Sequence, residues 1–93
     1  MNKIDLEYQP ATRPDLLFRE LNDGGVVYEY HSGALHSLNT TAAYIWSLCD
    51  GKHTVAEIII SIKQNFTRFE TDPTSEVIKI IEKFQTLNLL TEV

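Results

Sequence analysis

Several residue types that carry common functions are scarce in this chain. Its 93 residues include one cysteine, Cys49, so no internal disulfide can form, and no Cys-x-x-Cys pair suggests a metal site. No apolar run approaches the ~20 residues that a membrane-spanning helix needs, so no membrane partner is expected. Eight Lys and Arg stand against thirteen Asp and Glu, and the net charge is −5. Because DNA binding through phosphates needs clustered cations, the scattered basic residues argue against nucleic acid as a partner.

The low content of glycine and proline points to an ordered domain. Four Gly, three Pro and 43% hydrophobic residues are typical of one globular unit of this length. We expect residues 1–14, which are polar and hold two of the prolines, to form an N-terminal arm, and residues 15–93 to form the folded domain. The single thiol, together with the lack of an apolar signal-like stretch in residues 1–15, predicts a cytoplasmic protein.

The histidines do not form a catalytic or metal-binding pattern. None of His31, His36 and His53 lies three or four residues from another metal ligand on a predicted helix. The glycines of the Asn-Asp-Gly-Gly segment at 22–25 stand between two apolar runs and do not open a helix, as a phosphate-binding loop would. We therefore predict that the protein is not an enzyme and uses no cofactor or metal.

Three short strands are predicted in the first half of the chain. The runs LLFREL (16–21) and VVYEY (26–30) flank residues that tolerate the positive φ of tight turns. His-Ser-Gly makes a second turn, and ALHSL (34–38) is the third strand. Short loops imply an antiparallel meander in chain order. The alternation at 4–8 would suit a further strand, although a loosely docked terminus is the favoured interpretation.

Three helices are predicted to follow the strands. Asn39 or Thr40 can cap the first helix, which runs to about Cys49 and ends at the Asp-Gly of 50–51. TVAE at 54–57 has the form of a capping box, and the second helix runs from there to about residue 66. The side chains expected to form the core are Tyr44, Ile45, Trp46, Leu48, Ile58 and Ile62.

The third helix has a wider apolar face than one packing surface requires. Asp72-Pro73 begins it, it runs to about Leu87, and Asn88 can take the left-handed position after its end. Its apolar residues cover an arc of roughly 180°, whereas packing against one layer needs about 100°. These residues are Val77, Ile78, Ile80, Ile81, Phe84 and Leu87. The margins of the arc, Ile78 on one side and Ile80 with Leu87 on the other, either line a groove or pack against a second neighbour.

The third strand offers the other half of such a groove. The chain leaves this strand for a helix, so the strand should lie at the border of the sheet with unpaired N–H and C=O groups. ALHSL contains neither proline nor Lys, Arg, Asp or Glu, the usual protections of an exposed edge. Such an edge can template an added peptide strand, so the pattern favours peptide or protein recognition.

These segments also resemble a known family. LNTTAAYIWSLCDGKHTVAEI, preceded by LLFREL and GGVVYEYHSGALHSLN and followed by EVIKIIEKFQTLNLL, is similar to the PqqD family over about residues 15–91. The resemblance implies a RiPP recognition element with a winged-helix-like α+β fold, in which a three-stranded antiparallel sheet precedes three helices. Members act as peptide chaperones, which bind the leader of a ribosomally made precursor peptide and present it to a modifying enzyme, often a radical-SAM maturase.

The resemblance also implies a binding site. In such domains the leader adds as a fourth strand beside the third strand and against the third helix. Carried over, the peptide-binding residues are Ala34, Leu35, His36, Ser37 and Leu38 on the strand, and Val77, Ile78, Lys79, Ile81 and Gln85 on the helix. Two alternatives are a DNA-binding winged-helix regulator and a plain assembly subunit of a larger enzyme. An unprotected edge also allows a homodimer.

Overall fold

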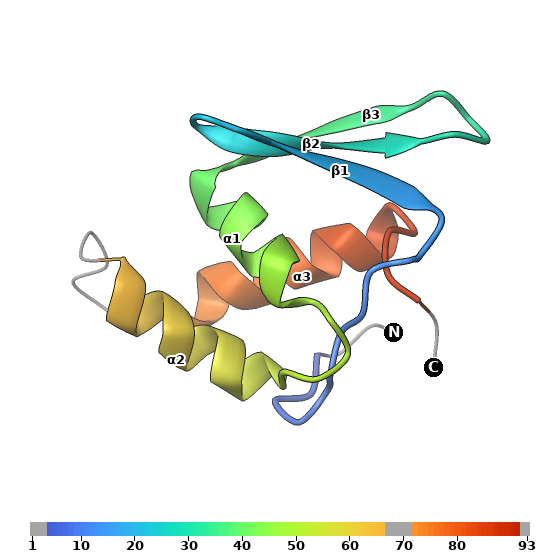
Figure 1. Ribbon diagram of the computed structural model, residues 1–93. Coiled ribbons are helices and arrows are strands. Elements are labelled where there is room, and N and C mark those ends of the chain that lie inside the picture. Colours follow the sequence, from blue (N-terminus) through green and yellow to red (C-terminus); the bar gives the residue numbers. More distant parts are fainter. Residues whose placement is uncertain (1–3, 67–71, 92–93) are drawn as a thin grey trace.

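A computed structural model shows three strands followed by three helices, and it describes residues 4–66 and 72–91. The strands are β1 (Leu16–Leu21), β2 (Gly24–Glu29) and β3 (Leu35–Asn39). The helices are α1 (Thr40–Leu48), α2 (Val55–Asn65) and α3 (Thr74–Thr86). The sheet forms one layer, and the helices lie together on one of its faces (Figure 1). The predicted α+β class and element order are confirmed.

The sheet is an antiparallel meander in the order β1-β2-β3, as the short loops predicted. Leu21 pairs with Gly24, so β2 begins two residues before the predicted start at Val26, and Tyr30 belongs to the following turn. Gly24 has a φ of 148°, and a side chain there would overlap the main-chain carbonyl of Leu38 on β3. This position therefore requires glycine, because β2 and β3 approach each other too closely for a Cβ atom.

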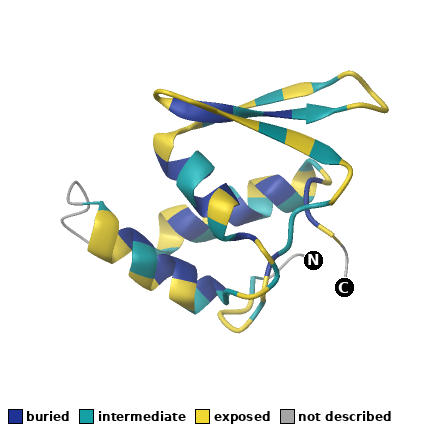
Figure 2. Cartoon of the chain, in the orientation of Figure 1, coloured by how far each residue is buried: buried dark blue, intermediate teal, exposed yellow. Residues whose placement is uncertain are grey.

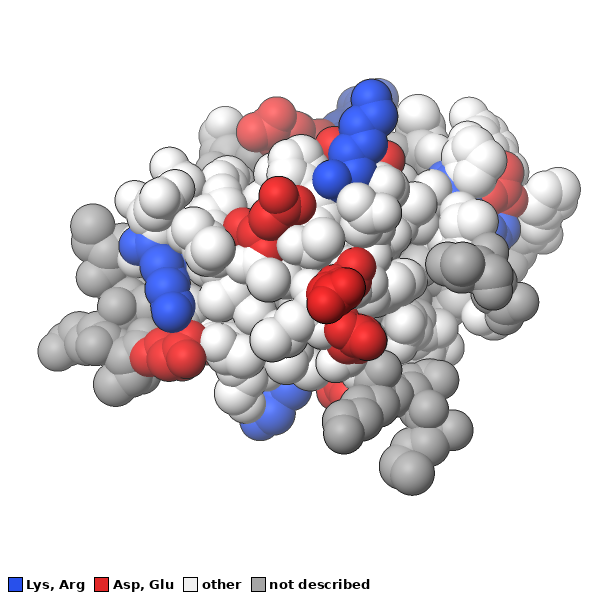
Figure 3. Space-filling model, turned by 90° about the horizontal axis from the view of Figure 1, so that it is seen from below, with Lys and Arg blue, Asp and Glu red and all other residues white. Residues whose placement is uncertain are grey.

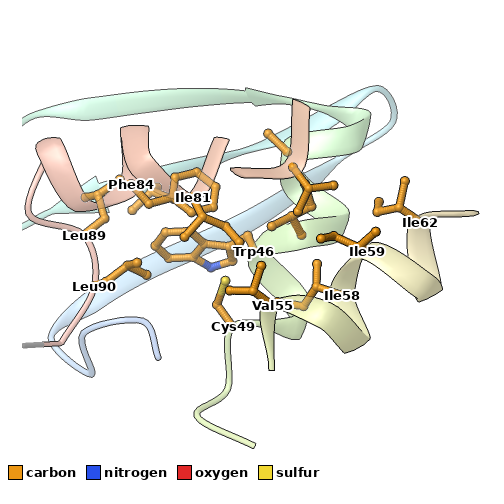
Figure 4. Close-up of a cluster of buried hydrophobic side chains, with 14 residues drawn as sticks. Trp46, Cys49, Val55, Ile58, Ile59, Ile62, Ile81, Phe84, Leu89 and Leu90 are labelled. Carbon is orange, nitrogen blue, oxygen red and sulfur yellow. The ribbon is translucent and has the colours of Figure 1, made fainter. Parts of the chain in front are cut away.

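Helix α1 is the centre of the fold, since it contacts β2, β3, α2 and α3. The ring of Trp46 lies 6.0 Å from that of Phe18 on β1 and 5.3 Å from that of Phe84 on α3, measured between centroids. Figure 4 shows the indole in the middle of the buried cluster, with Phe84 and Ile81 on one side and Cys49 and Val55 on the other. Of the predicted core residues, Ile45, Trp46, Ile58 and Ile62 are buried, and Tyr44 and Leu48 are partly buried.

The first two helices each begin directly after a residue whose side chain accepts a hydrogen bond from the first turn. The carboxamide oxygen of Asn39 accepts a hydrogen bond from the Ala42 N–H at 2.8 Å, which identifies Asn39, not Thr40, as the first cap. In α2 the Thr54 hydroxyl accepts from the Glu57 N–H at 3.1 Å, and the Glu57 carboxylate accepts from the Thr54 N–H at 2.8 Å. The predicted capping box is thus present in both directions.

Helix α3 begins one residue later than predicted, at Thr74 instead of Pro73. Pro73 is therefore the N-cap residue, without a side-chain cap, and the predicted Asp72 cap was wrong. Asp72, one residue earlier, accepts from the Thr74 hydroxyl and from the Thr74 N–H, the latter at 3.0 Å, and these two bonds lower the pKa of Asp72. Asn88 follows the C-cap residue Leu87 with a φ of 61°, so the left-handed position predicted for it is confirmed. Within residues 4–66 and 72–91, no helix has the length and apolarity needed to span a bilayer.

The described part of the N-terminal segment packs against the helices and does not join the sheet. The Tyr8 and Leu6 carbonyls accept from the first two amides of α2, those of Val55 and Ala56, at 2.8 and 3.0 Å. These amides have no partner within the helix, so the segment completes the cap. Further along, residues 11–13 form backbone hydrogen bonds with residues 89–91, which follow α3.

Cys49 is a core residue at the end of α1. Its side chain is 2% exposed, and it contacts the buried cluster around Trp46. Burial, followed by the nearby charge of Asp50, raises the pKa of the Cys49 thiol to about 12. Because the thiolate is the reactive form, the native thiol should be chemically inert.

We expect native protein to react with a disulfide reagent such as Ellman's reagent at pH 8 far more slowly than unfolded protein. A pKa near 12 leaves a thiolate fraction about 1,000-fold smaller than that of an ordinary thiol. The matched control is a Ser75→Cys variant, which adds a thiol at an exposed position of α3. Its second thiol should react at once, and equally rapid reaction of Cys49 in native protein would contradict the buried position.

Candidate functional site

Strand β3 borders the sheet, and its outer edge pairs with no strand among the described residues. The Glu29 N–H donates to the Ala34 carbonyl at 3.0 Å. In an antiparallel pair, positions that exchange hydrogen bonds recur at every second residue. It follows from the register that the backbone groups of His36 face β2, whereas those of Leu35 and Ser37 face outward. The edge therefore offers free N–H and C=O groups at alternate residues.

Strand β1 borders the other side of the sheet, but it is better protected than β3 against the addition of another strand. It carries two charged residues, Arg19 and Glu20, whereas β3 carries no Lys, Arg, Asp or Glu. Charges on an edge strand discourage the addition of another chain. A hollow of about 230 Å³ lies beside β1, and Glu20 and Phe66 are among its lining residues. The uncharged border at β3 is thus the more favourable one for adding a strand.

A groove of about 380 Å³ lies between β3 and α3. Four of its lining residues come from the end of β3, one from the first turn of α1, three from the second half of α3 and one from the C-cap of α3. They are His36, Ser37, Leu38, Asn39, Ala42, Ile80, Lys83, Phe84 and Leu87. The open backbone edge and this groove are contributed by the same strand, so a chain added to β3 would have its side chains directly above the groove.

The groove is apolar inside, with its polar groups at the lip. Phe84 is buried, and the small side chain of Ala42 leaves space between the sheet and α3. Ile80 and Leu87 are half-buried on the α3 side. Lys83 is exposed and makes no ion pair with any other residue in the described ranges. Such a lining suits an apolar side chain that arrives from an extended peptide.

A series of polar contacts links the groove residue His36 to Asn88, which follows α3. The Nε2 of His36 lies 2.7 Å from a carboxylate oxygen of Glu29, and the Arg13 guanidinium lies 3.7 Å from the other oxygen. Arg13 also donates to the main-chain carbonyl of Asn88 at 2.7 Å and pairs with Asp15, whose pKa it lowers through the hydrogen bond. These contacts connect β2 and β3, through Arg13, to the residue that follows the C-cap of α3.

The predicted strand residues fall at or beside this groove. His36, Ser37 and Leu38 line it, and Ala34 lies just before β3 at the turn. Leu35 belongs to the same edge, but its side chain is 66% exposed and alternates to the opposite face of the sheet from His36. The contribution of Leu35 to the site is therefore its backbone.

The predicted helix residues lie elsewhere on α3. Val77 and Ile81 are fully buried in the core, and Gln85 is half-buried but does not line the groove. Ile78 and Lys79 line a separate open hollow with Glu82. Of the two margins of the apolar arc, the one that faces the groove is the margin formed by Ile80 and Leu87.

Four groove residues escaped the sequence-based choice: Asn39, Ala42, Lys83 and Phe84. A signal for Lys83 was present, since Ile80, Lys83 and Leu87 are spaced at i, i+3 and i+7 and share one stripe of the helix. The pattern could not say which margin of the arc faces β3, because that depends on how α3 is rotated against α1 and the sheet.

The fold and the groove define a class of protein: a small winged-helix-like domain with an open strand edge above its third helix. The family model described as Coenzyme PQQ synthesis protein D (PqqD) matches residues 24–90, and the chain belongs to this family. The family indicated by the sequence is thus confirmed. No curated protein matches the chain at a significant level.

A solved structure shares the fold. It is described as TbiB1 in complex with the TbiA(beta) leader peptide, and it matches with a TM-score of 0.76 and 16% sequence identity. The match covers 89% of this chain and 96% of the other, so the two domains correspond along almost their whole lengths. At this identity the match establishes a common fold.

The backbone directions on β3 predict different effects of proline at neighbouring positions. Ser37→Pro removes an outward N–H and should leave the fold intact, with the free energy of unfolding changed by less than about 1 kcal/mol. His36→Pro removes an N–H that faces β2 and should cost roughly 1–3 kcal/mol. His36→Ala is the control, because it removes the imidazole and keeps the backbone N–H, so the difference between the two variants reports the loss of the N–H. Urea unfolding followed by circular dichroism gives the three values, and a Ser37→Pro variant as unstable as His36→Pro would contradict the deduced directions.

Proposed function

We propose that the protein is a non-catalytic peptide chaperone. It binds the leader region of a ribosomally made precursor peptide, which adds as a fourth strand beside β3, and presents that peptide to a modifying enzyme, often a radical-SAM maturase in this family. The observation that carries the proposal is the unpaired, uncharged edge of β3 above an apolar groove in a PqqD-family chain. The match to a protein described as a leader-peptide complex supports the same interpretation.

Main-chain hydrogen bonds supply part of the affinity with little demand on peptide sequence. The outward groups of Leu35 and Ser37 bond an incoming strand, and every second side chain of that strand then points toward the helices. Those side chains enter the groove between Leu38 on one wall and Ile80 and Leu87 on the other. Register and specificity come from these apolar contacts.

The binding strength suits a carrier that must release its cargo. An extended leader loses conformational entropy when it becomes ordered on the edge, and this cost offsets much of the interaction energy. The short edge limits the gain as well, since β3 has five residues and alternate ones face outward. We therefore expect moderate affinity and rapid exchange.

The residues at the groove favour binding over catalysis. His36 and Ser37 are neighbours in sequence, but strand alternation turns their side chains to opposite faces, so they form no base–nucleophile pair. The Nε2 of His36 is already engaged with Glu29. The modifying enzyme, in this proposal, supplies the chemistry, and both proteins work in the cytoplasm.

The charge distribution gives no support to the DNA-binding alternative. Figure 3 shows the side of the molecule opposite the sheet, where Lys and Arg are separated from one another and interspersed with Asp and Glu. On α3 the two lysines, Lys79 and Lys83, accompany two glutamates, Glu76 and Glu82. Phosphate binding requires a concentrated positive surface.

The test is a titration of ¹⁵N-labelled protein with the leader of the precursor peptide encoded next to its gene. We expect amide shifts along 35–39 and 80–87, and loss of binding by at least about tenfold in Ile80→Glu, because a charge would be buried in the groove. Ile60→Glu is the matched control, since Ile60 is 52% exposed on α2 and does not line the groove.

Two results would count against the proposal. In one, the leader binds Ile80→Glu as tightly as it binds wild-type protein. In the other, the shifts concentrate on the β1 border near Phe18 and Phe66. A Ser37→Pro variant, which keeps the groove but loses an outward amide, should also bind weakly.

A further inference from the structure

The groove differs in charge from the chain that forms it. The protein has thirteen Asp and Glu and eight Lys and Arg, yet none of the nine groove residues is acidic. The carboxylate of Glu29, which contacts the groove residue His36, also lies near Arg13 and is engaged with both. The charge at the groove lip is the ammonium of Lys83, which has no ionic partner among residues 4–66 and 72–91.

Lys83 lies between the two apolar residues of the same helical stripe. Ile80 and Leu87 flank it, about 4.5 and 6 Å away along the helix axis at ~1.5 Å per residue. Its methylene stem can cover the apolar wall while its ammonium stays at the water-exposed lip. A side chain of the bound strand placed between two apolar side chains therefore meets a positive charge.

We propose that the groove selects an acidic leader segment, in which an Asp or Glu is flanked two residues away on each side by apolar residues. Inward-facing side chains of a strand recur every ~6.6 Å, so three of them span about 13 Å, within a side chain's reach of the roughly 10.5 Å from Ile80 to Leu87. The outer two contact the apolar walls, and the central carboxylate pairs with Lys83. This inference rests on the proposed function and specifies the peptide class that the same site takes.

The net charge of −5 does not oppose this selection at the groove. At physiological ionic strength, charges more than about 8 Å apart are largely screened. A carboxylate in the groove therefore responds mainly to Lys83, and a basic peptide meets like charge there. The effect is one of specificity and register, since an ion pair at a solvent-exposed lip adds modest affinity.

Lys79 provides a matched control on the same helix. It is exposed and lies one turn before Lys83, but it lines the other hollow, next to Ile78 and Glu82. K79E and K83E change the net charge by the same amount. Because Lys83 is in the last turn of α3, where a cation favours the helix dipole, K83Q is added as a variant that removes the charge without introducing a negative one.

The experiment is a selection from a random 12-residue peptide library displayed on phage. Wild-type protein should enrich the apolar–x–acidic–x–apolar pattern, K83E should enrich Lys or Arg at the central position, and K79E should select as wild type does. Fluorescence anisotropy with the selected peptide and its Asp/Glu→Lys version should show a preference of about fivefold for the acidic peptide. This preference should vanish in K83Q and reverse in K83E.

The outcomes separate this inference from the proposed function. In one outcome, the selected peptides bind wild-type protein and lose binding in Ser37→Pro, but they show no acidic preference, or K83E shows the same preference as wild type. This outcome overturns the charge selection and leaves strand addition in place. In the other outcome, the selected peptides bind Ser37→Pro with the same affinity as wild type, or the selection enriches no peptide. Either result overturns the proposed function, and the charge selection fails with it. Circular dichroism of each variant establishes that it is folded.

Discussion

The contact between Trp46 and its two aromatic neighbours is the interaction on which the rest of the structure depends. The indole joins Phe18 of β1 to Phe84 of α3, and it does so from the helix that contacts both other helices as well as β2 and β3. Figure 2 shows the consequence: most buried residues lie in β2 and in the helices, whereas β3 alternates between exposed and intermediate residues. The helical layer is thus held under the sheet from its middle, and the border of the sheet is left free.

This arrangement produces the groove without any dedicated element. Three strands are too few to close a sheet, so two borders remain, and the fold treats them differently. The β1 border carries Arg19 and Glu20, whereas the β3 border is uncharged and faces a space that Ala42 is too small to fill. An added strand would satisfy the free backbone groups, and its side chains would occupy that space. The proposed peptide-chaperone function thus rests on a sheet with an open edge above an apolar helix.

Local signals in the sequence predicted most of the fold because each depends on neighbouring residues. The capping box at Thr54 and the left-handed Asn88 are satisfied within one helical turn. The hairpin from β1 to β2 is likewise encoded at its turn, although β2 starts earlier than its β-branched residues suggested. The same locality explains why the alternation at residues 4–8 did not identify their partner, which is the N-terminus of α2, almost fifty residues away.

The sequence by itself determined the order of elements, the capping box of α2, an uncharged final strand and an overly apolar third helix. It could not determine which margin of that helix meets the strand. A helix presents its apolar residues as an arc, and the rotation of the arc is set by packing against Trp46 and the other core residues, far away along the chain. The tertiary structure therefore decided that Val77 and Ile81 belong to the core and that Ile80, Lys83 and Leu87 belong to the groove.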